Sequence, residues 1–280
     1  MLRARLRLFH RSLSVHPLVN VAVQAARAAG HIILRHAHQT DRLTVTAKGK
    51  SDFVSEVDRA AEAEITRIVR RYYPDHGVLG EEGGTSGKAD AETVWIIDPL
   101  DGTTNFLHGI PHYAVSIGIT YRGKLAHGVI YDPNSNDLYT ATAGGGAQCN
   151  ARRIRVSRTD SLERSLIGTG APFRDEDRVQ RYLPQMGAVL NATAGIRRAG
   201  SAALDLAWVA RGRLDGFWET ALKPWDIAAG VLLVREAGGT VTELYGRKDV
   251  MDTGNVLAGN LAVHSALGRL LADSVEPSAG

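Results

Sequence analysis

The sequence predicts a mixed α/β protein in which the first half is of the α+β type and the second half is of the α/β type. In the first half, apolar segments at 113–120, 125–131 and 138–143 are separated only by short polar turns, which indicates an antiparallel meander. In the second half, short apolar strands alternate with helical segments. The glycine triplet at 144–146 lies between the two patterns, and we place a boundary between the halves there.

The first half begins with helical patterns and then changes to strands. Apolar side chains recur at helical spacing over residues 16–38 and predict an amphipathic helix. The polar segment 46–58 is predicted to be a loop that leads into a second amphipathic helix ending near Tyr72. A short strand at 78–80 then runs into an acidic, glycine-rich loop, and the apolar run 93–96 predicts a buried strand.

The second half alternates strands with helices. We expect strands at 166–168, 214–218, 240–244 and 256–258, and helices at 178–190, 201–210, 225–237 and 261–271. No low-complexity linker separates the halves, so residues 14–145 and 146–272 are expected to share a large interface. Residues 1–13 read as a leader and residues 273–280 as a disordered tail.

The composition is that of an ordinary globular enzyme. The chain has 280 residues, of which 44% are hydrophobic and 22% are charged, and this length allows a substantial core. No apolar run approaches the roughly 18–20 residues that a membrane-spanning helix needs. The single cysteine, Cys149, excludes an intrachain disulfide and a cysteine-rich zinc site, and it fits a reducing compartment. We therefore expect a cytoplasmic protein without a membrane association.

The basic character of the chain is concentrated in its leader. Four arginines lie within residues 1–13, which contain no acidic residue. Of the 33 basic residues, 29 remain outside the leader and face 30 acidic residues. The rest of the chain is therefore nearly neutral, and its charge gives little support to nucleic-acid binding. The leader has the arginine pattern of a transit peptide, but a frayed tail or a translation start placed too far upstream is the simpler interpretation.

One stretch, residues 97–106, combines carboxylates, a turn and a helix start. Asp98 and Asp101 follow a buried strand, Gly102 permits a sharp turn, and Thr103 lies where a helix is expected to begin. Carboxylate oxygens bind hard divalent cations, and the free N–H groups of a helix start bind phosphate oxygens. These parts together predict a metal-dependent phosphate site, although Asp-Gly alone is also a common turn.

Carboxylates from elsewhere in the chain can complete such a site. Two divalent cations need roughly three to five carboxylates from different elements. Glu81 lies in the acidic loop after the strand at 78–80, and Asp226 lies at the start of an apolar helix, where a helix cap is the alternative explanation. Asp58 lies near the start of the second helix, where capping and the helix dipole explain an acidic residue equally well.

Other reaction classes find little support. The Gly-Lys pair at 87–88 lacks the first glycine and the Ser or Thr of a Walker A loop. His108 and His112 have the spacing of helical metal ligands, but a glycine and a proline between them disfavour a helix. No Gly-x-Ser-x-Gly motif occurs, and nothing in the sequence marks Cys149 as a nucleophile.

Several segments resemble a known family. The segments 80–82 (Gly-Glu-Glu), 95–106 and 225–229 (Trp-Asp-Ile-Ala-Ala) are similar to the defining motifs of the inositol monophosphatases, which belong to the lithium-sensitive, magnesium-dependent phosphatases. Further similar segments follow in the same order at 51–58, 168–173, 197–203 and 236–239. The resemblance covers residues 14–272 and is most pronounced for bacterial inositol-1-monophosphatases.

This resemblance implies a five-layered αβαβα sandwich of the sugar-phosphatase type that forms a homodimer, with the site between the two halves. It also implies two to three Mg²⁺ ions. Glu81, Asp98 and the backbone carbonyl of Leu100 would hold the first ion. Asp98, Asp101 and Asp226 would hold the second, so that Asp98 bridges the two, and a third, weaker ion would lie near Glu81.

The resemblance assigns catalytic and phosphate-binding roles as well. The hydroxyl of Thr103, paired with Asp58, would position and deprotonate the metal-activated water, and Glu81 is counted with them as catalytic. The backbone N–H groups of Gly102 and Thr103 would bind the phosphate, and Asp101 is counted with the substrate-binding residues.

The second half would supply substrate specificity. By resemblance, Glu219 would accept hydrogen bonds from sugar-alcohol hydroxyls, and the backbone around Ala202 would line the pocket. Arg197 would reach the substrate or the partner subunit, with a structural ion pair as an equal alternative. Lys48 and Lys50 flank a glycine in a loop that is expected to move, with solvated lysines as an equal alternative.

These expectations together describe a magnesium-dependent phosphatase that hydrolyses myo-inositol monophosphate to inositol and phosphate. A fructose-1,6-bisphosphatase or a 3′-phosphoadenosine phosphatase shares the metal motifs and remains an alternative, although Glu219 and the compact length favour inositol phosphate. Some bacterial relatives also associate with RNA polymerase and the antitermination machinery. A role as an accessory factor in RNA polymerase antitermination is therefore the alternative from another class.

Overall fold

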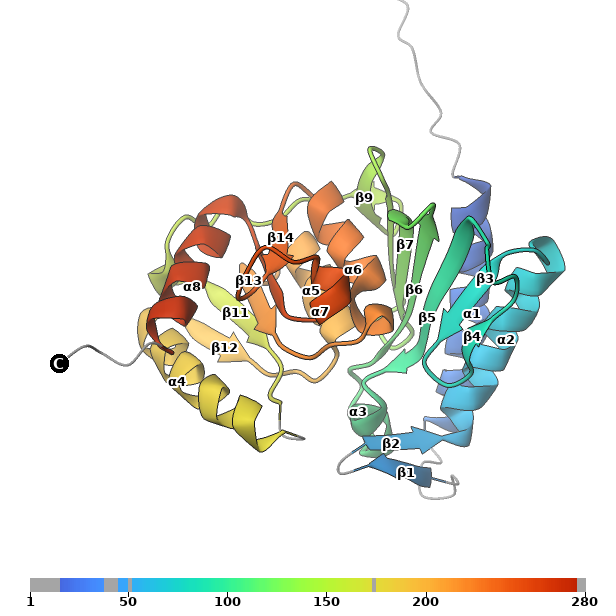
Figure 1. Ribbon diagram of the computed structural model, residues 1–280, viewed down its shortest axis with the longest axis horizontal. Helices are drawn as coiled ribbons and strands as arrows, with labels where there is room; N and C mark the ends of the chain where they lie inside the picture. Colours follow the sequence, from blue (N-terminus) through green and yellow to red (C-terminus); the bar gives the residue numbers. More distant parts are fainter. Residues whose placement is uncertain (1–15, 38–44, 50–51, 173–174, 276–280) are drawn as a thin grey trace, which may run out of the picture.

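A computed structural model describes residues 16–37, 45–49, 52–172 and 175–275. The leader predicted at 1–13, residue 50 and the end of the predicted tail lie outside these ranges. The described elements form five layers in the order helix, sheet, helix, sheet, helix (Figure 1). The predicted αβαβα sandwich is therefore confirmed.

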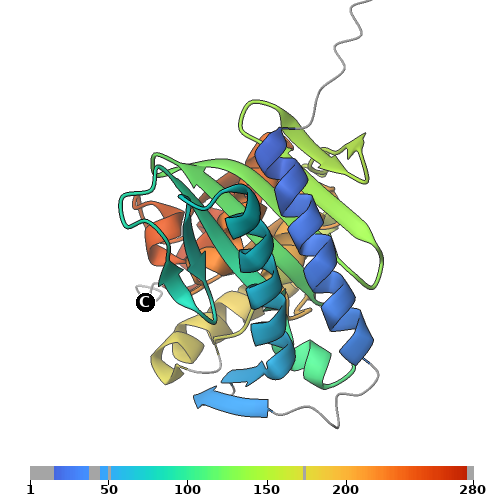
Figure 2. The ribbon, with the colours of Figure 1, turned by 90° about the vertical axis from the view of Figure 1, so that its right-hand side faces the viewer.

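The first layer consists of α1 (Pro17–His36) and α2 (Glu56–Tyr72), which lie side by side against the larger sheet (Figure 2). Both helices were predicted from their apolar spacing. α1 buries a stripe of small residues that includes Ala22, Ala25 and Ala29, so its backbone lies close to its neighbours. This layer places the first turn of α2, with Asp58, next to Thr103, which follows the end of β5.

A hairpin precedes α2. β1 (Val45–Gly49) and β2 (Asp52–Ser55) pair antiparallel, with an irregularity after Ala47. The prediction of a loop over 46–58 is therefore wrong. The polar, glycine-containing composition of the segment indicated a loop, but antiparallel backbone pairing does not depend on that composition.

The second layer is an eight-stranded sheet in the order β10-β9-β8-β7-β6-β5-β3-β4. Its strands are β3 (Gly77–Gly80), β4 (Gly84–Ser86), β5 (Thr93–Asp101), β6 (Ala114–Tyr121), β7 (Lys124–Asp132), β8 (Asp137–Thr142), β9 (Gly146–Cys149) and β10 (Arg152–Arg153). The predicted meander corresponds to β6, β7 and β8. The glycine triplet lies at the turn into β9, so the sheet continues past it.

The remaining layers come from the second half of the chain. α5 (Ala202–Ala210) and α6 (Pro224–Glu236) form the middle layer, and α4 (Glu176–Ala192) and α8 (Leu261–Asp273) form the outer one. Between them lies a five-stranded sheet in the order β12-β11-β13-β15-β14, made of β11 (Leu166–Thr169), β12 (Gly195–Arg197), β13 (Gly216–Glu219), β14 (Thr240–Glu243) and β15 (Val256–Gly259). The short helices are α3 (Thr103–Leu107), η2 (Leu162–Arg164) and α7 (Val250–Thr253).

The middle helices are apolar on all sides because each is covered by a sheet on two faces. Every residue of α6 from Ile227 to Val234 is buried. α5 approaches α6 closely at Gly230, where a Cβ atom would lie 2.6 Å from the side chain of Leu206. This apolar layer fixes the start of α6, and with it Asp226, against the larger sheet. Within the described ranges, no helix combines the length and the apolar character that crossing a membrane requires.

Candidate active site

Strand pairing places Glu81 beside Asp98. β3 and β5 run parallel, and their register aligns Gly80 with Ile97. The next residues along the two strands are Glu81 and Asp98. The parallel register therefore places the two acidic residues side by side, with Glu81 just past the end of β3 and Asp98 within β5. The backbone N–H of Glu81 also donates a hydrogen bond to the carbonyl oxygen of Ile97 at 3.1 Å.

An irregularity in β5 places Asp101 on the same side as Asp98. Asp98 pairs with Ser116 of β6, and Asp101 pairs with Ala114. Between these two pairs, β5 therefore contains one residue more than β6. Side chains alternate between the faces of a regular strand, and residues three apart would point to opposite faces. The extra residue of this bulge corrects that alternation. The Asp98 carboxylate stabilises the turn by accepting the N–H of Leu100 at 3.0 Å.

Gly102 ends the motif in the left-handed region, with φ +101°. A side chain there would be strained, and its Cβ would lie 2.9 Å from the carbonyl oxygen of His112. Thr103 begins α3, and its hydroxyl donates to Oδ1 of Asp58 at 2.8 Å. Asp58 is 1% exposed, so this pair lies behind the motif and not on the surface.

The two halves of the chain meet at Asp101. Its Oδ2 accepts hydrogen bonds from the hydroxyl of Ser201 at 2.6 Å and from the backbone N–H of Ala203 at 2.7 Å, both at the start of α5. Asn105 makes a second bridge by donating to the carbonyl oxygen of Ala199 at 2.8 Å. These bonds hold the start of α5 against the motif.

Asp226 arrives from the first turn of α6. Its Oδ2 accepts the backbone N–H of Lys223 at 2.7 Å, which is the capping role that the sequence left open. The hydroxyl of Ser116 lies 3.2 Å from the carbonyl oxygen of Trp225 and ties this helix start to β6 beside Asp98. The Asp226 carboxylate therefore caps the helix and also lines the site, so the two explanations do not exclude each other.

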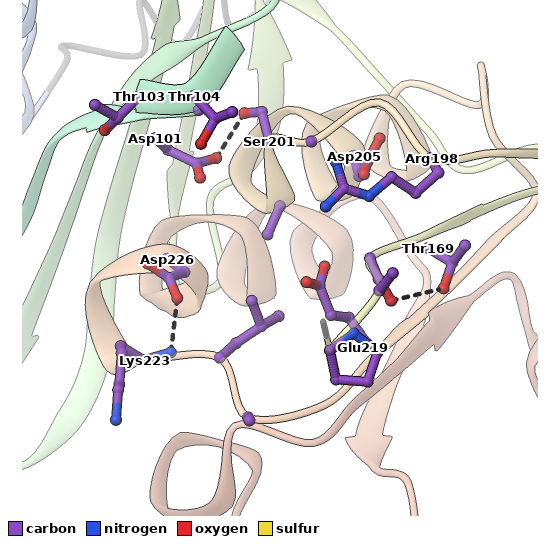
Figure 3. Close-up of a pocket in the computed structure, with 18 of the residues that line it drawn as sticks. Asp101, Thr103, Thr104, Thr169, Arg198, Ser201, Asp205, Glu219, Lys223 and Asp226 are labelled. Carbon is purple, nitrogen blue, oxygen red and sulfur yellow. Dashed lines mark hydrogen bonds between the residues drawn. The ribbon is translucent and has the colours of Figure 1, made fainter. Parts of the chain in front are cut away.

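These residues line a cavity of about 770 Å³ between the two halves. Asp101 and Asp226 lie on one side of it, and Arg198, Asp205 and Glu219 lie on the other (Figure 3). Glu219 ends β13 and lies against Gly170, where a Cβ atom would overlap the Glu219 carboxylate.

The structure brings most of the predicted site residues to this cavity. Its lining includes the predicted residues Glu81, Asp98, Leu100, Asp101, Gly102, Thr103, Ala202, Glu219 and Asp226. Asp58 is not among the residues that line it, but its carboxylate accepts a hydrogen bond from Thr103, which is. Lys50 lies outside the described residues, and the structure gives only the backbone of Lys48.

The expectation that Arg197 reaches the substrate does not agree with its position. Arg197 is exposed, donates to the carbonyl oxygen of Ile196 at 2.9 Å and is not part of the cavity wall, whereas its neighbour Arg198 is. Arg197 is the last residue of β12, and successive side chains at a strand end point in different directions.

The carboxylates in the cavity repel one another. Burial and the charges of Glu81, Asp101 and Asp226 hold the pKa of Asp98 well above its ordinary range. Burial raises the pKa of Asp101 to about 6, although the hydrogen bond from Ser201 opposes this shift. Burial and the charge of Asp101 raise the pKa of Asp226 to about 8.

On the opposite side of the cavity, called here the far wall, the pKa values of Glu219 and Asp205 are also raised, and Arg198 lies nearby. Burial, followed by the charges of Asp226 and Asp101, raises the pKa of Glu219 to about 8. Burial and the charge of Glu219 hold the pKa of Asp205 well above its ordinary range. The guanidinium of Arg198 lowers both pKa values and so partly offsets these shifts.

The donor set fits a hard divalent cation such as Mg²⁺. It consists of carboxylate oxygens and a backbone carbonyl, and the mutual repulsion of the carboxylates is what a bound cation relieves. Among the residues that the structure describes, however, no three acidic, histidine or cysteine side chains are already gathered closely enough to hold one ion.

Three contributors to the site escaped the sequence analysis. Arg198 and Asp205 line the cavity, and Oδ1 of Asp205 has no hydrogen-bond partner in the described part of the chain. Glu62 contacts the loop of Glu81 from behind. Neither Asp205 nor Glu62 belongs to a local motif. The sequence could have indicated them only as acidic residues among the apolar positions of a helix, where a buried charge needs an explanation.

Comparison with known proteins gives consistent results. The sequence profile described as the inositol monophosphatase family matches residues 14–278. The Nus factor SuhB of Pseudomonas aeruginosa is 48% identical over 269 residues, which cover 94% of this chain and 99% of that protein.

Two solved structures share the fold. The extragenic suppressor protein suhB from Bartonella henselae superposes with a TM-score of 0.89 at 46% identity, covering 91% of this chain and 98% of that one. The inositol monophosphatase from Anabaena (Nostoc) sp. PCC 7120 superposes with a TM-score of 0.80 at 40% identity, covering 93% of this chain and 97% of that one.

Proposed function

Because the chain belongs to the inositol monophosphatase family, we propose that it is a Mg²⁺-dependent phosphatase that converts myo-inositol monophosphate to inositol and phosphate. The observation that carries this proposal is the arrangement of the cavity. Glu81, Asp98, Asp101 and Asp226 line it together, and Glu219 lies across from Asp101 and Asp226 (Figure 3).

In this proposal, two Mg²⁺ ions would be held by Glu81, Asp98, the carbonyl of Leu100, Asp101 and Asp226, and a third, weaker ion would bind near Glu81. When bound, Mg²⁺ neutralises the phosphate dianion and lowers the pKa of the attacking water. Without a cation, the carboxylates would repel the substrate's phosphate, so binding of the cation precedes binding of the substrate.

The chain's own residues then orient the water and the phosphate. The Thr103 hydroxyl donates a hydrogen bond to Asp58, so its lone pairs can accept a hydrogen bond from a water in the cavity. When that water loses a proton to Thr103, the hydroxyl proton of Thr103 passes to the Asp58 carboxylate. Glu81 completes the catalytic group. The N–H groups of Gly102 and Thr103 bind the phosphate, and Asp101 contacts the substrate beside it. Gly102 also allows the left-handed turn that begins α3.

The far wall binds the hydroxyl groups of the polyol. Glu219 accepts hydrogen bonds from substrate hydroxyls, and the backbone at Ala202 bounds the pocket beside Asp101. A carboxyl whose pKa lies near 8 can also donate a hydrogen bond when protonated, so it matches hydroxyls that donate or accept.

A substrate panel tests this proposal. The purified protein is assayed with Mg²⁺ against inositol 1-phosphate, fructose 1,6-bisphosphate and 3′-phosphoadenosine 5′-phosphate. We expect the highest kcat/KM with inositol 1-phosphate. A higher kcat/KM with either bisphosphate would contradict the proposed substrate and favour the corresponding alternative enzyme.

The proposal extends to the setting of the enzyme. We expect a cytoplasmic homodimer that Li⁺ inhibits, with Arg197 on the exposed surface available to the partner subunit. Sedimentation of the purified protein measures its oligomeric state, and Li⁺ titration of its activity measures inhibition.

A second candidate function rests on the relatives' names. The relative from Pseudomonas aeruginosa that is 48% identical over 94% of this chain is a Nus factor. We propose an accessory role in RNA polymerase antitermination as the alternative or additional function. A strain that lacks this protein is complemented with the Asp98→Asn variant. Full complementation by this catalytically impaired protein would show that the essential role is not phosphatase activity.

A further inference from the structure

Glu62 is a buried carboxylate that no part of the proposed reaction uses. It lies on α2, one helical turn after Asp58, and is 7% exposed. Its two oxygens accept backbone hydrogen bonds from the β3–β4 turn (residues 81–83). Oε2 accepts the N–H of Glu82 at 2.8 Å, and Oε1 accepts the N–H of Gly83 at 2.7 Å.

The turn is shaped to receive this carboxylate. Two successive backbone N–H groups that point to one side form a small anion-binding concavity, which the Glu62 carboxylate occupies. The neighbouring glycines leave it the space. A Cβ atom at Gly80 would lie 2.5 Å from Glu62 Cδ, and one at Gly83 would lie 2.7 Å from Glu62 Oε1. Side chains at either position would push the carboxylate away from the turn.

The same turn carries Glu81, the proposed Mg²⁺ ligand. On one side, the N–H of Glu81 bonds to Ile97, the residue before Asp98. On the other side, the next two N–H groups bond to Glu62. The backbone of Glu81 is therefore held between β5 and α2.

Helix α2 contacts the second ligand-bearing segment through Asp58. Asp58 and Glu62 are four residues apart and so lie on one face of the helix. Asp58 bonds to Thr103, which follows the ligand segment 98–101, and Glu62 bonds to the turn of Glu81. One rigid helical turn thus touches both segments that must meet around a cation.

We propose that Glu62 is a positioning residue that sets the place of Glu81 relative to Asp98, and that α2 braces the two ligand segments through Asp58 and Glu62. The inference rests on the proposed function only in taking Glu81 as a Mg²⁺ ligand. Glu81 and Asp98 come from different segments, so the distance between their side chains depends on the backbone that carries them. A brace that fixes this backbone raises the affinity for Mg²⁺ without touching the ion.

Glu62→Gln tests the brace. Glutamine has nearly the same volume, but it keeps one acceptor oxygen and turns an N–H group toward a backbone N–H. We expect the Kd for Mg²⁺, measured by calorimetric titration without substrate, to rise by about 10- to 100-fold. The Mg²⁺ concentration for half-maximal hydrolysis of p-nitrophenyl phosphate should rise in parallel.

Glu64→Gln is the matched control. Glu64 lies on the same helix, but it faces Arg67, to which it bonds at 2.8 Å on the surface. The same chemical change there should leave the Kd for Mg²⁺ at the wild-type value.

Gly83→Ala tests the same contact from the other side and does not depend on the folding of the Glu62 variant. Its methyl group displaces the carboxylate, so the Kd for Mg²⁺ should rise again. The double variant should bind Mg²⁺ no more weakly than the weaker single variant, because both changes break one contact.

A purely structural role predicts a different outcome. Glu62→Gln and Gly83→Ala would then lower the Tm of the metal-free protein while their Kd for Mg²⁺ matched that of Glu64→Gln, and this result would overturn the proposal. Because the titrations contain no substrate, a failure to hydrolyse inositol 1-phosphate would contradict the proposed function without changing this comparison.

Discussion

The cavity wall that carries Asp98 and the wall that carries Glu219 are assembled differently. Residues 98–105 contribute most of the first wall within one strand end, one bulge and one helix start. The second wall takes Thr169 from β11, Arg198 from the loop after β12, Asp205 from α5 and Glu219 from β13. The first wall therefore depends on local backbone geometry, and the second depends on the packing of the whole C-terminal half.

The charges of the two walls differ as well. At the first wall, burial followed by neighbouring carboxylates raises the pKa values of Asp98 and Asp226, and burial raises the pKa of Asp101. No cationic side chain is among the causes of these shifts. At the second wall, the guanidinium of Arg198 lowers the pKa values of Glu219 and Asp205. The first wall is thus suited to a cation and a phosphate, and the second to an uncharged, hydroxyl-rich group. Substitutions in each wall should separate these two functions.

Asp98→Asn should have the largest effect, because Asp98 is proposed to contact both ions. We expect kcat for inositol 1-phosphate to fall by about 10³-fold. The Tm of the metal-free variant should rise at neutral pH, since the folded protein raises the pKa of Asp98 and so disfavours its ionised form. Steady-state kinetics and thermal unfolding without metal measure the two effects.

The control for this variant is Asp90→Asn, which neutralises an exposed carboxylate beside Lys88. Its activity and stability should remain near those of the wild type. Retention of Mg²⁺-dependent activity in Asp98→Asn would break the assignment of the first wall to the cation.

Thr103→Ala should have the next largest effect. It removes the hydroxyl that Asp58 orients, while the backbone N–H groups that face the cavity remain. We expect kcat to fall by about 10²-fold with little change in KM, and Asp58→Asn should behave in the same way. A rise in KM without a fall in kcat would place Thr103 in substrate binding alone.

The sequence predicts the residues of the first wall better than those of the second. Asp98 to Thr103 form a contiguous motif, so residue order alone indicated their chemistry. Glu81 and Asp226 were accessible because each lies at the end of a recognisable strand or the start of a recognisable helix. Arg198 and Asp205 could not be found in this way, since their places depend on strand direction at the end of β12 and on the burial of α5 between two sheets. The helices and strands of each half were predictable because apolar periodicity recurs in them. Their stacking into five layers was expected only from the family resemblance, and the β1–β2 hairpin was missed because its segment is polar and contains glycine.

Glu219→Gln should act on the polyol and leave phosphate binding intact. We expect kcat/KM for inositol 1-phosphate to fall by about tenfold, which is the size of one hydrogen bond to a charged group. p-Nitrophenyl phosphate has no hydroxyl for this wall to bind, so its kcat/KM should not change. An equal loss with both substrates would contradict the division between the walls.

The same variant changes how stability depends on pH. The folded protein raises the pKa of Glu219 from 4.5 to about 8, so the folded state binds more protons than the unfolded state between these values. Stability of the metal-free protein therefore falls as the pH rises through this window. Glu219→Gln should remove part of that fall, so its gain in Tm should be larger at pH 8 than at pH 4.5.

Arg198→Ala and Arg197→Ala form the smallest and sharpest comparison, because the two arginines are neighbours and both are exposed. Only Arg198 lines the cavity and lowers the pKa of Glu219. Removing it raises that pKa further and takes one cation away from the wall that carries Glu219. We expect KM for inositol 1-phosphate to rise by about threefold in Arg198→Ala, as for other exposed charges. Arg197→Ala should leave KM unchanged, because its guanidinium bonds to the backbone carbonyl of Ile196 outside the cavity wall. A larger rise in KM for Arg197→Ala would mean that the side chain at the end of β12 turns toward the substrate when the cavity is filled.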